Sequence, residues 1–186
     1  DAVVTVTGLT AGSHTIKLVK QSGTWMVLDG FVVIPTAIQP AHDITFSGVT
    51  LQYNTWLSEL SQGYPENQTG IMWSESNPWY QVKDPGMIDI ERGSNVTFTN
   101  DTIAHTGDSG VDVGNGTQNS TLSDSRILDT AVNAVQVGEV DDYYLTATSL
   151  MTSGYTVTGN FIEHSGVVFQ STSGILVGYT RNVTVS

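Results

Sequence analysis

Two consecutive stretches of equal length decide the fold: NVTFTNDTIAHTGDSGVDVG (residues 95–114) and NSTLSDSRILDTAVNAVQVG (residues 119–138). They align without a gap, and their apolar positions agree: Phe98 with Leu122, Ile103 with Ile127, Val111 with Val135, and Val113 with Val137. Three short alternating strands in a repeat of about 24 residues are typical of a parallel β-helix, whose coils pair with the coils above and below. A β-sandwich would also contain short strands, but it does not predict a gapless self-match.

Further copies of the repeat lie on both sides. YTVTGNFIEHSG (155–166) with SGILVG (173–178) forms a third copy, and NVTVS (182–186) begins another. DITFSGVTLQY (43–53) and GMIDIERG (86–93) form an earlier copy that is split by an insertion at residues 54–86. Because strand-like alternation dominates, the sequence predicts an all-β protein with about four β-helix coils over residues 39–186.

The composition excludes several classes of function. Six Lys and Arg residues against eighteen Asp and Glu residues give a net charge of −12, which argues against binding nucleic acid or an anionic membrane surface. No apolar run is long enough to span a membrane as a helix. The absence of Cys excludes disulfides and thiolate metal sites.

Residues 1–38 do not follow the repeat. GLTAGSHTIKLVKQSG (8–23) and LDGF (28–31) indicate strands joined by Gly-containing turns. This stretch resembles the closing strands of sugar-binding β-sandwich modules that are appended to secreted glycosidases. The resemblance implies a partial β-sandwich module over residues 1–38.

The repeat region also resembles a family, through AHDITFSGVTLQYNTWL (41–57), GYPENQTGI (63–71) and the two repeats quoted above. It is similar to secreted right-handed parallel β-helix proteins of the pectate-lyase-like superfamily, particularly the glycoside-hydrolase-type members. The resemblance implies a right-handed β-helix, secretion and a polysaccharide partner. The NTD…DD…GHG…RIK series of polygalacturonases is absent, and the basic residues are scattered. With a net charge of −12, a neutral or weakly charged polysaccharide fits better than a polyuronate.

The repeat alignment also predicts a catalytic pair. Strand alternation places Asp112 on the outer face, and the same position in neighbouring coils is held by Asp89, Gln136 and Leu176. Carboxylates on adjacent coils stand about 5 Å apart, which is the spacing of a retaining glycosidase pair. We therefore expect Asp112 and Asp89 to be catalytic, with Glu139 and Asp141 as the reserve candidates for the second carboxylate. Calcium ligation and a plain acidic surface are the alternative interpretations, and no other cofactor or metal is expected.

Candidate substrate-binding residues fall into two groups. The insertion carries Trp56, Tyr64, Trp73 and Trp79, whose rings suit stacking on sugar faces but could equally form a small core against the helix flank. A second column of equivalent positions holds Tyr53, His105, Asp129 and His164. We expect His105, His164 and Gln136 to contact substrate, while a corner stack that satisfies backbone groups is the alternative for the histidines.

Six Asn-X-Ser/Thr sequons predict a secreted glycoprotein: Asn67, Asn95, Asn100, Asn115, Asn119 and Asn182. Part of this excess follows from the β-helix repeat itself, in which a corner Asn precedes a Val-Thr strand. The chain begins and ends within strands, which predicts either a longer polypeptide or self-association through the open β-helix ends. The leading functional hypothesis is glycoside hydrolysis. A non-catalytic structural or adhesive β-helix that forms extracellular fibres is the alternative.

Overall fold

The computed structural model describes residues 40–57, 68–73 and 81–186. The chain divides into two units, residues 1–39 and 40–186, and the strands expected within residues 1–38 lie outside the described residues. The described part is all-β, which confirms the predicted class; its helical content is limited to two short 3-10 segments, η2 (Gln68–Gly70) and η3 (Asp142–Tyr144). None of its helices is long and apolar enough to cross a membrane.

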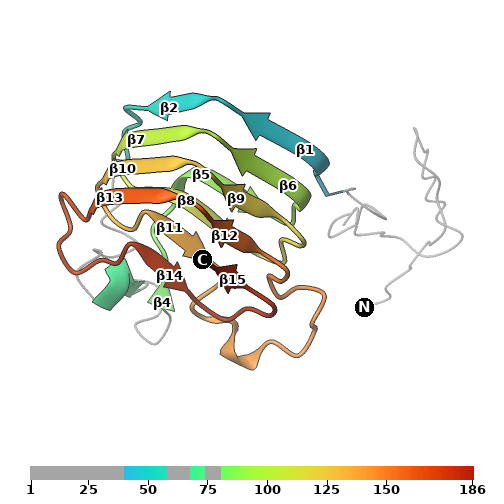
Figure 1. The fold of residues 1–186 in the computed structure, drawn as a ribbon. Helices are drawn as coiled ribbons and strands as arrows, with labels where there is room; N and C mark the ends of the chain where they lie inside the picture. Colours follow the sequence, from blue (N-terminus) through green and yellow to red (C-terminus); the bar gives the residue numbers. More distant parts are fainter. Residues whose placement is uncertain (1–39, 58–67, 74–80) are drawn as a thin grey trace, which may run out of the picture. The chain divides into compact units, whose positions relative to one another are not determined.

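Three parallel sheets make up the described part (Figure 1). The first sheet contains, in spatial order, β1 (His42–Ser47), β6 (Ser94–Thr99), β9 (Thr121–Ser123), β12 (Thr156–Thr158) and β15 (Thr184–Val185). The second contains β2 (Thr50–Gln52), β7 (Thr102–Thr106), β10 (Arg126–Thr130) and β13 (Phe161–Ser165). The third contains β5 (Gly86–Glu91), β8 (Ser109–Gly114), β11 (Val135–Val137) and β14 (Ile175–Val177). A short antiparallel pair, β3 (Met72–Trp73) and β4 (Gln81–Val82), belongs to the insertion.

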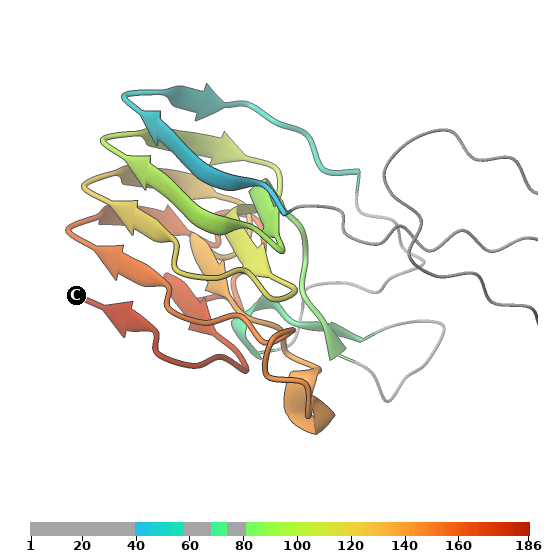
Figure 2. The same ribbon diagram turned by 90° about the vertical axis from the view of Figure 1, so that its right-hand side faces the viewer.

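The chain visits the three sheets in a fixed order. From β6 it passes through β7 and β8, and it returns to the first sheet at β9, one level along the stack. Figure 2 shows these levels lying on one another from the first strands to the C-terminus. The insertion interrupts the order between β2 and β5. This arrangement is compatible with the coiled repeat that the sequence predicts.

The pairing register confirms the repeat alignment at each apolar position. Phe98 pairs with Leu122, Ile103 with Ile127, Val111 with Val135 and Val113 with Val137. The third copy continues the same columns, with Val157 opposite Leu122 and Ile175 opposite Val135. These side chains form one buried core between the three sheets. Each fully buried aliphatic side chain contributes about 1.5–3 kcal/mol to folding through its removal from water.

The corners of the repeat require residues that tolerate a left-handed backbone. Between the first and second sheets, the equivalent positions are Gly48, Asn100, Asp124 and Gly159, all with positive φ. Where the chain enters the first sheet they are Asp43, Asn95, Asn119, Gly154 and Asn182, again with positive φ. Gly lacks the Cβ that disfavours this conformation, and Asn and Asp tolerate it best among the other residues. This geometry accounts for four of the predicted sequons, Asn95, Asn100, Asn119 and Asn182, as structural corners.

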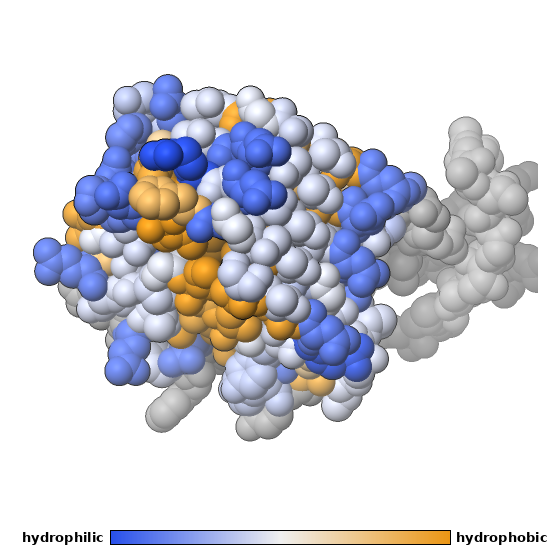
Figure 3. Space-filling model, viewed as in Figure 1, coloured by the Kyte–Doolittle hydropathy of each residue, from blue (hydrophilic) through white to orange (hydrophobic). Residues whose placement is uncertain are grey.

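The outermost strands carry partly exposed apolar side chains. Ile44 and Phe46 of β1 are 37% and 41% exposed and line an apolar cavity of about 440 Å³ beside β5. On the face drawn in Figure 3, hydrophobic residues gather where β14 and β15 lie in Figure 1. Val177 of β14 and Val185 of β15 are both about half exposed. The core is therefore dense in the middle levels and thinner at β1, β14 and β15.

Truncation of a core residue should cost far more stability than truncation of its outward neighbour. Leu122 has no exposed surface and lies between Phe98 and Val157, so Leu122→Ala should lower the free energy of unfolding by about 2–5 kcal/mol. Thr121→Ala on the same strand is the matched control, because Thr121 points away from the core and is only half buried. Urea unfolding monitored by circular dichroism measures both. Equal losses for the two variants would contradict the register described above.

Candidate functional site

The predicted outward column on the third sheet is present in register. Asp89 pairs with Asp112, Asp112 with Gln136, and Gln136 with Leu176. The expected exposure is wrong for three of these residues. Asp112 is only 8% exposed, Leu176 is 9% exposed, and Gln136 has no exposed surface. The side chains of Asp112 and Gln136 leave the core, as strand alternation requires, but another part of the chain covers them.

The covering layer comes from the insertion. Lys83 and Asp84 contact Asp112 of β8 and Gln136 of β11, and Asn133 Nδ2, just before β11, donates to the carbonyl of Thr69 at 2.6 Å. Gln136 Nε2 donates to the carbonyl of Asp84 at 2.9 Å, so the amide of Gln136 is used inside the protein. Gln136 therefore holds the covering segment in place. The prediction that Gln136 contacts substrate is wrong, because its side chain has no exposed surface.

Asp84 belongs to a column of corner caps. Its Oδ2 accepts a hydrogen bond from Ser109 N at 2.8 Å, and Ser109 Oγ accepts one from Asn133 N at 3.0 Å. In the next level Asn133 Oδ1 accepts from Ser173 N at 2.8 Å. Each cap accepts a hydrogen bond from a backbone amide at this corner, and Ser109 N donates also to the carbonyl of Pro85 at 3.2 Å. Asp84 is fully buried and acts as a structural cap of the third-sheet corner.

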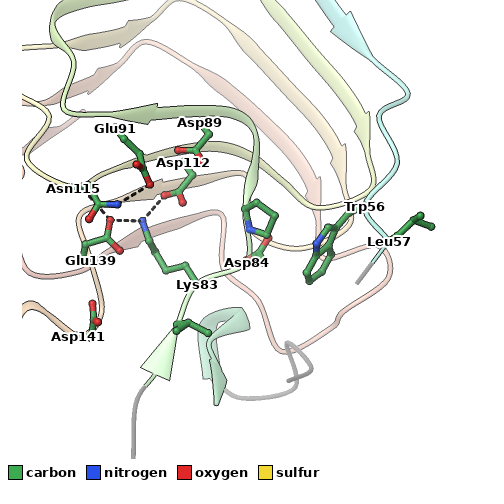
Figure 4. Close-up of a pocket in the computed structure, with 12 residues that line it drawn as sticks. Trp56, Leu57, Lys83, Asp84, Asp89, Glu91, Asp112, Asn115, Glu139 and Asp141 are labelled. Carbon is green, nitrogen blue, oxygen red and sulfur yellow. Dashed lines mark hydrogen bonds and ion pairs between the residues drawn. The ribbon is translucent and has the colours of Figure 1, made fainter. Parts of the chain in front are cut away.

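Lys83 brings two of the predicted carboxylates together. Its Nζ lies 2.5 Å from Asp112 Oδ1 and 3.5 Å from Glu139 Oε1. The Lys83 side chain is 4% exposed, and Figure 4 shows it reaching between the two acids from the segment that precedes β5. Because both acids contact one nitrogen atom at these distances, Asp112 Oδ1 and Glu139 Oε1 lie at most 6.0 Å apart. We call Lys83, Asp112 and Glu139 the carboxylate–lysine cluster.

Glu139 is positioned by the loop that follows β8. Its Oε1 accepts a hydrogen bond from Asn115 N at 3.0 Å, while Asn115 Nδ2 donates to Glu91 Oε1 at 2.7 Å. Gly114 leaves the space that this contact needs, because a Cβ atom there would collide with Glu139 Oε1. Asn115, a predicted sequon, thus fixes two carboxylates at the site.

A pocket of about 560 Å³ opens beside the cluster. Its walls are Trp56, Leu57, Val82, Lys83, Asp84, Pro85, Asp89, Glu91, Asp112, Asn115, Glu139 and Asp141. Six of these residues are acidic, and Lys83 is the only basic residue among them. The pocket therefore favours cationic groups and disfavours anionic ones, while neutral groups meet no charge repulsion.

Burial controls the ionisation of the acids in this pocket. Loss of solvent raises the pKa of Asp112 to about 6, although the neighbouring Lys83 acts to lower it; Glu139 and Asp89 raise it further. Partial burial, and then the charge of Glu91, raise the pKa of Asp89 above its usual value. Asp112 thus keeps its proton to a higher pH than an exposed aspartate does.

The second predicted column, Tyr53, His105, Asp129 and His164, is also present. The rings of Tyr53 and His105 stack with centroids 4.9 Å apart. His105 Nδ1 and His164 Nδ1 lie 3.3 and 3.1 Å from the two oxygens of Asp129. All four residues have positive φ, so they form a corner stack on the second sheet. None of them lines the 560 Å³ pocket, so the structure does not bring His105 and His164 to the predicted acids.

The aromatic candidates separate in the same way. Trp56 lines the pocket, and its ring lies edge-on to the ring of Phe169, with the two centroids 6.2 Å apart. Trp73 lies on β3, is 44% exposed and does not line the pocket. Tyr64, Trp79 and the sequon at Asn67 lie outside the described residues. Of the two aromatic candidates among the described residues, Trp56 is therefore the one beside the acids.

Sequence reasoning missed Lys83 and Asp84. Lys83 counts only as one of the scattered basic residues and Asp84 is not singled out, because the insertion has no periodicity from which a contact with β8 or β11 follows. One signal was available: Lys83 is the only lysine beyond residue 20, and it directly precedes the strand that carries Asp89. As for the calcium alternative, in residues 40–57, 68–73 and 81–186 no group of three or more acidic or histidine side chains is arranged to hold a metal ion.

The buried Asp84 should make stability fall as the pH rises. Burial raises the pKa of Asp84 to about 7 in the folded protein, from 3.8 for a free side chain. Between these values the folded state keeps a proton that the unfolded state releases, so the free energy of unfolding falls from about pH 4 to pH 7. One such group gives a slope of up to about 1.4 kcal/mol per pH unit. Urea unfolding across this range should show a shallower slope for Asp84→Asn, and an unchanged slope would contradict the assignment. Asp124→Asn, at an exposed corner, is the control.

Comparisons with known proteins find no relative of this chain. No protein-family model matches the sequence, and no curated protein or solved structure matches it either. The interpretation of the pocket therefore rests on the residues themselves: two acids held by one buried lysine, further acids around them, and Trp56 at the wall.

Proposed function

We propose that the protein is a secreted glycoside hydrolase that cleaves a neutral or weakly charged polysaccharide with Asp112 and Glu139. The observation that carries this proposal is the shared contact of both acids with Lys83, which limits their facing oxygens to a separation of 6.0 Å. Retaining glycosidases hold their two carboxyl groups about 5–5.5 Å apart, whereas inverting enzymes need about 6.5–9.5 Å. The geometry thus favours retention of configuration.

The environments of the two acids suit different roles. Asp112, with its pKa raised to about 6, is the general acid that donates a proton to the glycosidic oxygen. Glu139 forms an ion pair with Lys83 and accepts a hydrogen bond from Asn115 N, and it attacks the anomeric carbon as nucleophile. Asp112, now ionised, then removes a proton from the water that hydrolyses the glycosyl–enzyme bond, and the acid is restored.

The walls of the pocket support the substrate class. Trp56 offers an aromatic face for a sugar ring, whose C–H groups are apolar. The excess of acidic residues disfavours a polyuronate, because its carboxylates would meet Asp89, Glu91 and Asp141. A neutral glycan, or one with few charges, avoids this repulsion.

The proposed scaffold is a right-handed parallel β-helix of about four coils, with the insertion at residues 54–86 forming one wall of the active site. The three parallel sheets and their cyclic order support this description. Exposed corner asparagines such as Asn95, Asn100 and Asn182 are accessible for glycosylation in a secreted chain.

A non-catalytic structural or adhesive β-helix that assembles into fibres is the second candidate. The half-exposed apolar side chains of β1, β14 and β15 favour it, because such surfaces promote association. A protein that binds but does not cleave any glycan, and whose assembly depends on Phe46 or Val177, would support this candidate over hydrolysis.

Removal of either acid should abolish hydrolysis without unfolding the protein. Asp112→Asn and Glu139→Gln are each expected to lower kcat/KM by about 100-fold or more, because general acid–base catalysis alone contributes about 10²–10⁴-fold. The measurement is the release of reducing ends from soluble xylan, β-glucan, galactan and mannan, with polygalacturonate as the anionic comparison. Asp124→Asn is the matched control, since it makes the same chemical change at an exposed corner away from the pocket.

Two outcomes would change this assignment. If Asp89→Asn abolishes hydrolysis and Glu139→Gln does not, the second carboxylate is Asp89, which lies opposite Asp112 on β5. If the wild-type protein and Asp112→Asn hydrolyse the glycans at the same rate, Asp112 has no part in the reaction.

The rate should also fall as the pH rises through about 6. Asp112 must be protonated to act as an acid, and burial raises its pKa to about 6. Above this pH the acid form is lost, so kcat/KM is expected to decrease about tenfold per pH unit. A profile measured between pH 4 and 8 on the best glycan checks this. A rate that increases across the same range would require a base in place of the proposed acid.

A further inference from the structure

Lys83 is placed unlike an ordinary surface lysine. It comes from the insertion rather than from a repeat strand, yet its side chain is 4% exposed and its nitrogen contacts acids on two different levels of the third sheet. Asp112 lies on β8, and Glu139 follows β11. A buried ammonium group in this position needs both partners, because an unpaired charge is costly away from water.

The contacts involve only one oxygen of each acid. Lys83 lies against Asp112 Oδ1 and Glu139 Oε1, and Asn115 N also donates to Oε1. Within the described part of the chain, Asp112 Oδ2 and Glu139 Oε2 accept no hydrogen bond. Each acid therefore has one oxygen fixed by the protein and one that remains for a ligand.

Acidic groups from several neighbouring elements surround the cluster. The acidic groups that face it are Asp89 and Glu91 on β5, Asp84 beside Lys83, Asp141 before η3, and Asp142 at its start. Among the residues that line the pocket, no second cation offsets them. Without the ammonium group, two acids within 6.0 Å would share a single proton, as paired carboxylates do in other buried sites.

We propose that Lys83 is the positioning residue of the carboxylate pair: its charge opposes the protonation of Asp112 that the crowded acids favour, and its contacts with one oxygen of each acid orient their free oxygens toward the pocket. This inference rests on the proposed function for its catalytic consequence, but the state of the two acids can be measured without any substrate. Lys83 does not touch the reacting atoms in this scheme. It acts through Asp112 and Glu139.

The test uses the titration of the carboxyl carbons, followed by ¹³C NMR on the full chain. The Asp112 signal is assigned by its loss in Asp112→Asn. In Lys83→Met the apolar chain is kept and the charge is removed, so the midpoint of the Asp112 titration should rise by about 1–3 pH units. Lys83→Arg keeps the charge and should leave the midpoint near that of the wild-type protein. An unchanged midpoint in Lys83→Met overturns the proposal.

A second variant keeps the proposal testable if Lys83→Met does not fold. Glu139→Gln leaves the ammonium group with Asp112 as its only charged partner and removes a neighbouring negative charge. The Asp112 midpoint should then fall below the wild-type value, and an unchanged midpoint again overturns the proposal.

Activity separates this inference from the proposed function. If the midpoints move as expected and the wild-type protein hydrolyses none of the glycans, the proposal of glycoside hydrolysis is wrong. The inferred effect of Lys83 on the protonation and orientation of the two acids is then still supported. If the wild-type protein is active, the falling limb of its pH profile should move to higher pH in Lys83→Met and return in Lys83→Arg. A purely structural lysine would lower the rate without moving the limb.

Discussion

The whole arrangement depends on one constraint: in parallel sheets that stack in register, each residue lies about 4.8 Å from its equivalent one level away. Like side chains must therefore tolerate one another. Phe98 above Leu122 and Val111 above Val135 exploit this in the core, where contact between apolar groups is favourable. Gly, Asn and Asp exploit it at the corners, where the same left-handed backbone recurs at each level.

The same constraint becomes a difficulty where the stacked residues are charged. Asp89 lies directly opposite Asp112, and Glu139 approaches from the next level. In water such repulsion would be weak, but the insertion covers Asp112 and lowers the local dielectric constant. The buried Lys83 and the raised pKa of Asp112 are the two physical responses to this crowding. A site under this kind of electrostatic strain is typical of function rather than of stability.

The sequence predicts the columns but not what covers them. The gapless match between residues 95–114 and 119–138 placed Asp112 and Gln136 in register, and the split copy at residues 86–93 extended the column to Asp89, because register follows from periodicity. The burial of Gln136 and the position of Lys83 depend on how the aperiodic insertion folds back, and neither alternation nor spacing carries that information. The same limit applies to Trp56 and Trp73. Both are tryptophans of the insertion, and the sequence does not indicate that Trp56 lines the pocket whereas Trp73 does not.

The two columns of polar residues show why burial, rather than residue type, singles out the candidate site. By residue type, His105, Asp129 and His164 resemble a catalytic set, and each histidine lies within hydrogen-bonding distance of Asp129. Their side chains are between about a third and two thirds exposed, so water screens their charges and their mutual interaction is weak. Asp112 and Lys83 make a similar contact in a nearly dry setting, where each charge strongly affects the protonation of the next. The insertion that interrupts the repeat converts one surface column into a pocket, and the column it leaves uncovered remains a corner of the scaffold.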